Sequence, residues 1–299
     1  MGGVSLDVLC VGHASFDQVF TVPHHPGPDE KLFADALMLC GGGPAANASI
    51  MVAKLGLLAG FSGYLGRDVF GSAHLEELLS AGVDVSGVVR GDLPTPLSTV
   101  LVKPGGARSL VNFKGGTGVL PASAVDYSNI SARTLLFDGH EPELSVALLS
   151  RPVPKVLDAG SLHAGTRRLM GEVDHLVASE KFAREWLGRD DPHAALQALS
   201  LVAPVVVITL GEKGLLWHAD GCQGQMDAPA VQAIDSTGAG DAFHGAYAAG
   251  VAAGWDFKRI LRVASACGAA CCEVLGARPG LPDQARLDVI LERTGQGLE

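Results

Sequence analysis

The stretch DSTGAGDAFHGA, Asp235 to Ala246, decides which fold this chain can adopt. Gly238 and Gly240 stand on either side of one small residue, an acid follows at Asp241, and small and apolar residues continue from there. Glycine permits positive φ and close backbone approach, so we expect a strand end, a tight turn and a helix that begins near Asp241. Backbone N–H groups at such a helix start can bind an anion such as a phosphate. A plain glycine turn with Asp241 as the helix N-cap fits the same letters.

A second glycine-rich stretch is GGGPAANASIMVAKLG, Gly41 to Gly56. Three glycines followed by Pro44 are typical of a helix start, and they leave an open surface on which a polar ligand can lie against the backbone. Asn47 then falls on the first helical turn, where it is a candidate ligand contact. A strand-to-helix loop with a solvated Asn47 explains the stretch equally well.

The same glycines also match a dinucleotide-binding fingerprint, Gly41-x-Gly43-x-x-Ala46, with Asp68 about 20 residues on as the ribose-binding acid. This match makes a nicotinamide-dependent oxidoreductase an alternative from another class. The fingerprint should follow the first strand of the main sheet. Here the first strand-like run, at 6–12, is followed by GHASFD, and the glycines come only after an irregular segment.

Short strand-like runs alternate with helical patterns along the chain. Continuous apolar runs indicate strands that are buried on both faces, so we expect an α/β fold with a mostly parallel central sheet and helices on both faces. The runs lie at 6–12, 134–138, 155–160, 175–179 and 204–211. Two segments, about 16–39 and 94–114, break the pattern, and the second reads as two strands joined by a turn at Gly105 and Gly106. We expect them to form a small β lid on a single domain that spans 1–299.

The chain carries 32 acidic and 22 basic residues, a formal net charge of -10. This balance disfavours nucleic acid or an anionic membrane surface as a partner and favours a small-molecule ligand. No apolar run is long enough to cross a membrane, and the first residues, MGGVSLDVLCVGH, lack the basic region of a signal peptide. We therefore expect a cytoplasmic protein.

Six pieces of the chain, taken in order, resemble the ribokinase-like, or PfkB, family of carbohydrate kinases. They are VGHASFD with Asp17, GGGPAANAS, SGYLGRDVFG, VVITLGEKG, DSTGAGDAFHGA and GARPGLP. The resemblance covers essentially the whole chain. Within the family it is similar to the ketohexokinase branch or the sulfofructose kinase branch, the latter through GGGPAA and GAGD-x-FHGA. It implies ATP-dependent phosphorylation of a hydroxymethyl group of a small sugar or sugar derivative.

The resemblance also implies roles for individual residues. Asp241 corresponds to the catalytic base, and Gly238, Ala239 and Gly240 correspond to an anion hole for phosphate oxygens. A helix N-terminus favours the ionised form that a base needs. Residues implied to hold sugar hydroxyls are Asp17, Gly42, Gly43 and Asn47, and residues implied to bind ATP are Thr209, Gly211, Gly214, Gly238 and Gly240.

The lid and the strand ends carry the candidates for substrate choice, namely Lys31, Asn112 and His140, with Lys114 and Glu141 beside them. Lys31 and Asn112 match places where some members of the family grip an acidic or highly polar sugar substituent. His140 stands where an arginine would bind a sulfonate. Solvated surface side chains explain Lys31 and Lys114 equally well.

Cations and partners are also implied by the resemblance. The family's N-x-x-E sequence, which helps to organise Mg²⁺, reads Ser179-Glu180-Lys181-Phe182 here, so Glu180 is the candidate metal residue, acting through water. A Ser-Glu pair that caps a helix explains the same letters. K⁺ near the GAGD loop is a further candidate, although Glu273 stands where a small hydroxyl residue is frequent. Lids of family members often pair, which predicts a homodimer.

Two alternatives remain beside the sugar kinase and the oxidoreductase. A nucleoside kinase of the same fold would share the phosphate machinery and would favour aromatic stacking, for which a 5% aromatic content offers little. A non-catalytic sugar sensor on the same fold would have no need of Asp241.

Overall fold

The computed structural model describes residues 3–105 and 107–293, so Gly106 of the predicted turn lies outside the described residues. Within these ranges the main sheet has nine strands in the order β13-β12-β11-β10-β9-β8-β1-β4-β5. Neighbours from β11 to β5 pair in parallel, and β12 and β13 add an antiparallel edge. The strands are β1 (Val4–Val11), β4 (Ala59–Gly66), β5 (Asp84–Gly91), β8 (Ile130–Phe137), β9 (Lys155–Ala159), β10 (His175–Ser179), β11 (Val205–Thr209), β12 (Leu215–Ala219) and β13 (Cys222–Met226).

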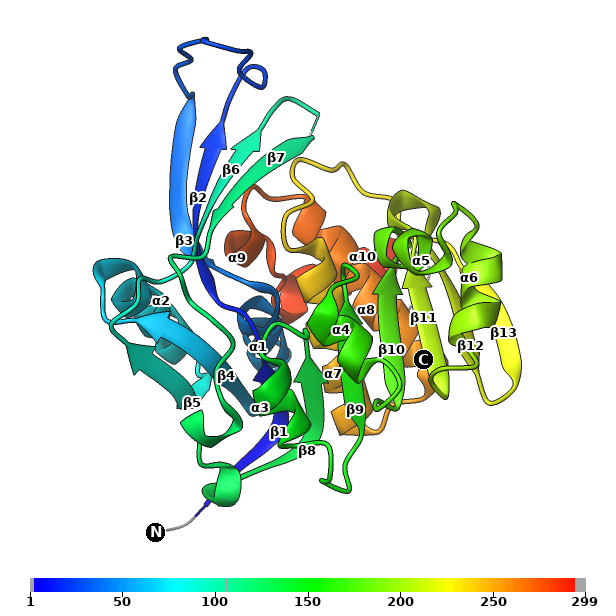
Figure 1. The fold of residues 1–299 in the computed structure, drawn as a ribbon. Coiled ribbons are helices and arrows are strands. Elements are labelled where there is room, and N and C mark those ends of the chain that lie inside the picture. The colour runs from blue at the N-terminus through cyan, green and yellow to red at the C-terminus, as the bar shows by residue number, and fades with distance from the viewer. Residues whose placement is uncertain (1–2, 106, 294–299) are drawn as a thin grey trace.

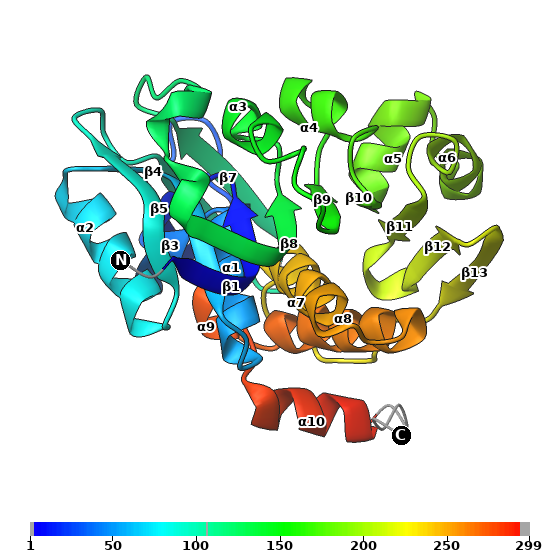
Figure 2. The same ribbon diagram turned by 90° about the horizontal axis from the view of Figure 1, so that it is seen from below.

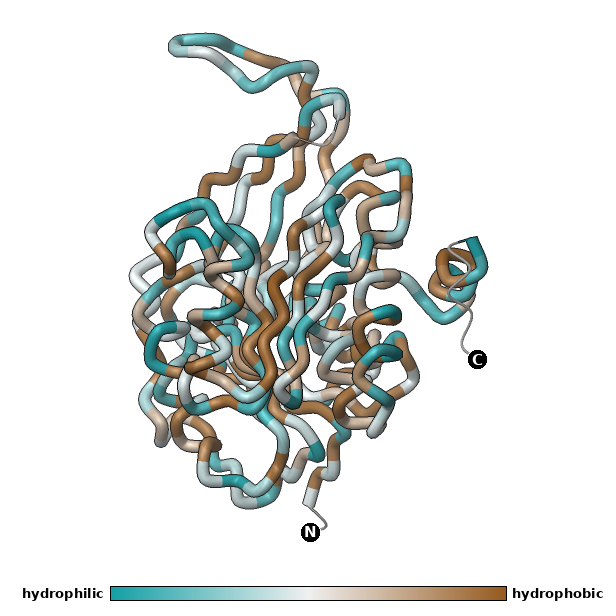
Figure 3. Tube along the Cα trace, turned by 90° about the vertical axis from the view of Figure 1, so that its right-hand side faces the viewer, coloured by the Kyte–Doolittle hydropathy of each residue, from teal (hydrophilic) through white to brown (hydrophobic). Residues whose placement is uncertain are grey.

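Helices cover both faces of this sheet because its central strands are apolar on both sides. In β1, Val8 and Cys10 belong to one buried cluster, while Leu9 and Val11 belong to the other. Figure 3 shows the apolar segments concentrated along the central strands. The alternation of strands and helices thus gives two cores separated by one sheet.

The first core is covered by α1 (Pro44–Lys54), α2 (Val69–Ser80), α7 (Ala239–Ala253), α8 (Phe257–Cys272) and α10 (Gln284–Arg293). The second is covered by α3 (Pro142–Val146), α4 (Ala164–Leu169), α5 (Glu180–Leu187) and α6 (Pro192–Leu199), on the opposite face (Figures 1 and 2). The short helix α9 (Ala277–Gly280) connects α8 to α10. The predicted α/β class with a mostly parallel sheet and helices on both faces is confirmed.

A second sheet projects from the body, with the order β3-β2-β6-β7 (Figure 1). Its strands are β2 (Ser15–Thr21), β3 (Ala36–Gly42), β6 (Leu97–Val102) and β7 (Arg108–Phe113). Strand β2 pairs antiparallel with β3 and parallel with β6, and β6 pairs antiparallel with β7. We call this sheet the lid. A small apolar cluster around Val19, Val100 and Val102 fills one of its faces together with Leu275.

The parallel strands of the body end at one edge, and the lid rises from that edge (Figure 1). Loops that follow the carboxyl ends of parallel strands are where ligands bind in open α/β sheets. None of the helices in the described ranges has the length and apolar character that a membrane crossing needs.

Candidate active site

The glycine turn before α7 is held in shape by a buried carboxylate. Asp235 Oδ1 accepts hydrogen bonds from the Thr237 backbone N–H at 2.9 Å and hydroxyl at 2.6 Å, and Oδ2 accepts one from the Gly276 N–H at 2.8 Å. Gly238 is the N-cap residue of α7 with φ 80°, and a Cβ there would lie 2.6 Å from that of Ala277. Only glycine therefore fits this turn without strain.

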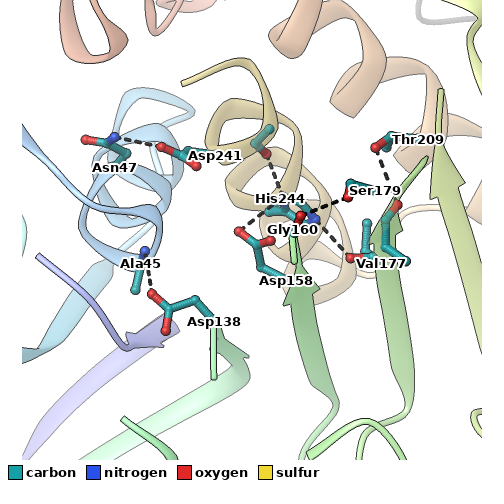
Figure 4. Close-up of polar contacts among 12 residues, drawn as sticks. Ala45, Asn47, Asp138, Asp158, Gly160, Val177, Ser179, Thr209, Asp241 and His244 are labelled. Atoms are coloured by element: carbon teal, nitrogen blue, oxygen red, sulfur yellow. Dashed lines mark hydrogen bonds and ion pairs between the residues drawn. The ribbon is translucent and has the colours of Figure 1, made fainter. Parts of the chain in front are cut away.

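Asp241 lies in the first turn of α7 and is not its N-cap residue. Its Oδ2 accepts a hydrogen bond from Asn47 Nδ2 in the first turn of α1, across 2.7 Å (Figure 4). Burial, and then the nearby Asp158, raise the pKa of Asp241 to about 7, while the hydrogen bond from Asn47 lowers it. The expectation that the helix N-terminus keeps this carboxyl ionised therefore underrates burial.

A cavity of about 480 Å³ opens beside Asp241, between the body and the lid. Of the residues that the sequence singled out, it brings together Asp17, Gly43, Asn47, Asn112, Lys114, His140, Gly238 and Asp241. Lys31 is not among its lining residues, and its ammonium lies 5.6 Å from the centre of the Phe33 ring on the exposed loop of the lid. Glu141 is also outside the lining, and its carboxylate accepts a hydrogen bond from the Leu120 N–H at 2.8 Å.

Asp17 reaches the cavity from β2 of the lid. Its side chain is buried, and its Oδ1 accepts a hydrogen bond from the Ser15 hydroxyl at 2.9 Å. Burial raises the pKa of Asp17, whereas hydrogen bonds and the charge of Arg278 lower it. Gly42 lies behind this carboxylate, where a Cβ would collide with it. Gly42 therefore makes room for Asp17 and does not itself line the cavity.

On the opposite wall, sequence reasoning found His140 and missed the other histidines and the acids around it. His13 and His163 flank His140, with ring centres 5.1 Å and 4.6 Å from it, and all three line the cavity. Asp138, at the end of β8, accepts backbone hydrogen bonds from His13 at 2.7 Å and from His140 at 2.8 Å. The letters VGH and DGHEP mark two adjacent strand ends, and this signal could have paired them.

The Asp138 carboxylate also accepts a hydrogen bond, at 3.2 Å, from the backbone N–H of Ala45 at the start of α1 (Figure 4). One buried carboxylate thus joins the ends of β1 and β8 to the helix that carries Asn47. Its geometry makes it a structural anchor of the cavity.

Asp158 and His244 lie beneath Asp241. His244 Nδ1 is 3.3 Å from Asp158 Oδ2 and 2.6 Å from the Gly240 carbonyl oxygen, while Nε2 is 3.1 Å from the carbonyl oxygen of Val177 (Figure 4). Burial raises the pKa of Asp158. His244 therefore ties the first turn of α7 to β9 and β10.

A second cavity, of about 640 Å³, lies on the other side of the glycine turn. Its lining includes all three residues predicted on the strand β11 side, Thr209, Gly211 and Gly214, together with Ala239 and Gly240. Ser265, Gly268 and Ala269 form its α8 wall. Many of the lining residues are small, which leaves this cavity wide.

The lid and the turn are in direct contact between the two cavities. The guanidinium of Arg108, on β7, donates a hydrogen bond to the Ser236 hydroxyl at 2.6 Å. Arg108 lines the first cavity and Ser236 lines the second.

Glu180 lies in neither lining. It follows Ser179, whose hydroxyl accepts the Phe182 N–H at 3.0 Å as the N-cap of α5, and its carboxylate pairs with Lys213 at 3.3 Å. Capping therefore explains the Ser-Glu pair in this structure. In the described ranges no group of three or more His, Cys, Asp or Glu side chains could by itself hold a metal ion.

The oxidoreductase alternative is wrong. Gly41 and Gly42 end β3 of the lid and do not follow the first strand of the main sheet. Asp68, the expected ribose acid, is the N-cap residue of α2 and accepts the Gly71 N–H at 2.7 Å.

Comparison with known proteins decides the family, because a model described as "pfkB family carbohydrate kinase" matches residues 5–284. The chain belongs to the PfkB family of carbohydrate kinases. It is thus a phosphotransferase, as the order of its motifs predicted. Its PfkB relatives include a ribokinase from Arabidopsis thaliana, 27% identical over 93% of this chain and 79% of that protein.

Two further PfkB relatives differ in the names they carry. A probable fructokinase-5 from Arabidopsis thaliana is 28% identical over 82% of this chain and 86% of that protein. A nucleoside kinase from Methanothermobacter thermautotrophicus is 27% identical over 93% of each.

Solved structures of ribokinases are similar over nearly the whole chain. The ribokinase of Thermotoga maritima superposes with a TM-score of 0.86 over 96% of this chain and 99% of that one, at 24% identity. The Arabidopsis thaliana ribokinase complexed with ribose and ATP superposes with a TM-score of 0.80 over 98% and 99%, at 25% identity.

Proposed function

We propose that this protein transfers the γ-phosphoryl group of ATP to a hydroxymethyl group of a small sugar or sugar derivative. The observation that carries the proposal is the position of the glycine turn between two cavities. Thr237, Gly238 and Asp241 face the first cavity, while Ala239 and Gly240 face the second. A sugar in the first and ATP in the second would meet at the turn.

Asp241 is the proposed base. The attacking hydroxyl oxygen forms a bond to the γ-phosphorus, its proton passes to the Asp241 carboxylate, and the bond to the bridging oxygen breaks to release ADP. The N–H groups of Gly238, Ala239 and Gly240, at the positive end of α7, would stabilise the charge on the transferred group. Asn47 holds the carboxylate towards the cavity.

The sugar would lie against Asp17, Gly43 and Asn47, with Asn112 and His140 at its far end. A buried acid and an amide suit hydroxyl groups, because a site built to bond a hydroxyl discriminates against analogues that lack it. Lys31 could contact a substrate only after movement of the exposed loop that carries it.

Mg²⁺ would accompany ATP and neutralise charge on its phosphates. Mg²⁺ is usually held by phosphates and waters with one or two carboxylates, so a complete set of protein ligands is not needed. The residues present fit such an ion in this respect. Glu180 would contribute through water, after release from Lys213. K⁺ would lie between the turn and the segment after α8, which Asp235 and Gly276 join.

The test is a coupled assay for ADP release across ketoses, aldoses, acidic sugars and nucleosides, with and without Mg²⁺, and in K⁺ or Na⁺ buffers. We expect turnover with one class of sugar. Turnover with nucleosides alone would favour the nucleoside kinase, a name that one relative carries. Binding of a sugar without turnover of any substrate would favour the sensor.

We further propose that the protein is a homodimer formed through the lid. Leu37, Leu39 and Val111 alternate with the residues that face the body, so they share the outer face of the lid, where each is more than half exposed. Exposed apolar side chains that share one face favour an interface, and a second copy of the same face would cover them.

Sedimentation of Val111→Lys tests the dimer. We expect the variant to be monomeric, while Leu201→Lys, which changes an 88% exposed leucine on the body, should leave the assembly unchanged. A monomeric unmodified protein at micromolar concentration would contradict the proposal.

A further inference from the structure

A buried arginine connects the lid side of the molecule to Asn47. Arg278, in α9, is only 7% exposed. Its Nε–H donates to Asn47 Oδ1 at 3.2 Å, and its Nη1 donates to Glu77 Oε2 on α2 at 2.5 Å. The remaining nitrogen, Nη2, contacts His74 Nε2. One guanidinium thus joins α1, α2 and α9.

The contact with Arg278 determines which way the Asn47 amide points. A guanidinium carries only N–H donors, so the atom of Asn47 that faces it must be the amide oxygen. The amide nitrogen then faces the other side, where it donates to Asp241 Oδ2 at 2.7 Å. Without Arg278 either end of the amide could face Asp241, and an amide oxygen there would repel a carboxylate.

Glu77 is the partner that keeps the guanidinium in place. Its two carboxylate oxygens also accept the backbone N–H of Gly41, at 3.1 and 3.0 Å, from the end of the lid strand β3 shortly before α1. The Glu77 side chain is 35% exposed, so it can be solvated if Arg278 is lost, whereas a buried Arg278 without Glu77 would be costly.

We propose that Arg278 is a positioning residue that fixes the Asn47 amide with its N–H towards the Asp241 carboxylate, and that Glu77 holds Arg278 in this role. The inference rests on the proposed function in that Asp241 is taken as the base. Neither Arg278 nor Glu77 lines the cavity, so neither touches the reacting atoms.

The other groups that face Asp241 come from three elements. They are Asp158 on β9, His244 on α7 and Asp17 on β2. Asp158 and Asp17 disfavour ionisation of Asp241, while His244 and the Asn47 hydrogen bond favour it. If the Asn47 amide no longer turns its N–H towards Asp241, one of the two contributions that favour ionisation is lost. The pKa of Asp241 should then rise.

The experiment compares Arg278→Met with Arg286→Met. Arg286 is a matched control, because it also ties this segment together, through hydrogen bonds to the carbonyl oxygens of Gly280 at 3.1 Å and Ala270 at 2.7 Å, away from Asn47. We expect the acidic limb of kcat/KM to move up by about one pH unit in Arg278→Met. In Arg286→Met the acidic limb of the pH profile should stay at the same pH, even if this variant loses thermal stability.

Arg278→Lys keeps the proposal testable if Arg278→Met does not fold. Lysine retains the charge but cannot bond Asn47, Glu77 and His74 at once. It should therefore also move the limb upward. A folded Arg278→Met or Arg278→Lys variant with an unchanged limb would overturn the proposal.

A second readout separates this inference from the proposed function. The Asp241 carboxyl carbon can be followed by ¹³C NMR in the ligand-free protein, with Asp241→Asn for its assignment. An upward shift of its titration midpoint in Arg278→Met supports the positioning role even if no substrate is turned over. An unchanged midpoint in a folded variant contradicts it, even if the protein proves to be an active kinase.

Discussion

The Asn47 amide donates a hydrogen bond to the Asp241 carboxylate across 2.7 Å, although 194 positions separate the two residues in the chain. Each lies in the first turn of its helix, α1 or α7, and each follows a glycine-rich stretch. The bond therefore brings the two glycine-rich motifs of the sequence to one point.

Asp241→Asn should abolish most turnover. We expect kcat to fall by about 10²- to 10⁴-fold, because the variant keeps the shape of the side chain and cannot take a proton. ATP binding, measured by calorimetry, should change little. A variant with a near-normal rate would show that another group is the base.

The same variant should not lose stability at pH 8. Burial raises the pKa of the Asp241 carboxyl to about 7, so its contribution to stability is present at low pH and is lost as the pH rises through this value. When the variant is compared with the unmodified protein above pH 7, Asp241→Asn should have an equal or higher Tm. A lower Tm would mean that the carboxylate is a net stabilising group.

Activity should depend on the ionisation of Asp241. The value of kcat/KM should rise with pH through about 7 and then level off, since the base acts in its ionised form. The nearby Asp158 raises the pKa of Asp241, and Asp158→Asn removes the acidic group of this neighbour, so the variant should have its limb at lower pH. A limb that stays in place, or moves upward, would rule out Asp158 as the group that disfavours ionisation.

Gly238→Ala should damage catalysis more than folding. The added methyl group would meet Ala277 and displace the turn, and loss of one aligned N–H donor lowers kcat by about 100-fold. Gly254→Ala is the control, because Gly254 has a similar φ of 70° at the other end of α7 and open space around its Cβ position. Similar losses of kcat in both variants would assign the effect to backbone strain alone.

Asp17→Ala should weaken the sugar site selectively. Loss of a charged hydrogen-bond acceptor should raise the KM for sugar by about tenfold or more and leave the KM for ATP nearly unchanged. Asp92→Ala, which changes an exposed acid on the body, is the control. Equal rises in both KM values would place Asp17 outside the sugar site.

Ala269→Leu should have the opposite selectivity. The larger side chain would fill part of the second cavity and raise the KM for ATP by about tenfold, while the KM for sugar stays the same. Ala253→Leu, on the exposed end of α7, should change neither. A selective effect of Ala269→Leu on the sugar would reverse the assignment of the two cavities.

The sequence allowed the fold class and the glycine turn before α7 to be predicted, because both depend on local signals. Apolar runs mark buried parallel strands, and β10 was predicted at its observed bounds, 175–179. The edge strand β13 was missed because it is polar and mostly exposed. Its neighbour β12 was also missed, although it is largely buried. Without an apolar pattern, an edge strand is recognised only from its pairing partner.

Residues that act through contacts distant in sequence could not be predicted in this way. His13 and His163 come together with His140 because β1, β8 and β9 are neighbours in the sheet, an order that no local pattern reveals. Lys31 was implied by the resemblance to the family, yet it is not among the residues that line the cavity. Strand order and lid geometry depend on tertiary contacts, so local sequence patterns do not predict these residues.

The bond between Asp235 and Gly276 has a consequence for the order of events during synthesis. A ribosome makes the chain from its N-terminus, and domains generally fold as their segments emerge. The turn acquires its second anchor only from a residue 41 positions later, and Gly238 packs on the residue after that. A nascent chain that ends before Gly276 thus already contains the nine strands of the main sheet described above and still lacks the partner that shapes its glycine turn.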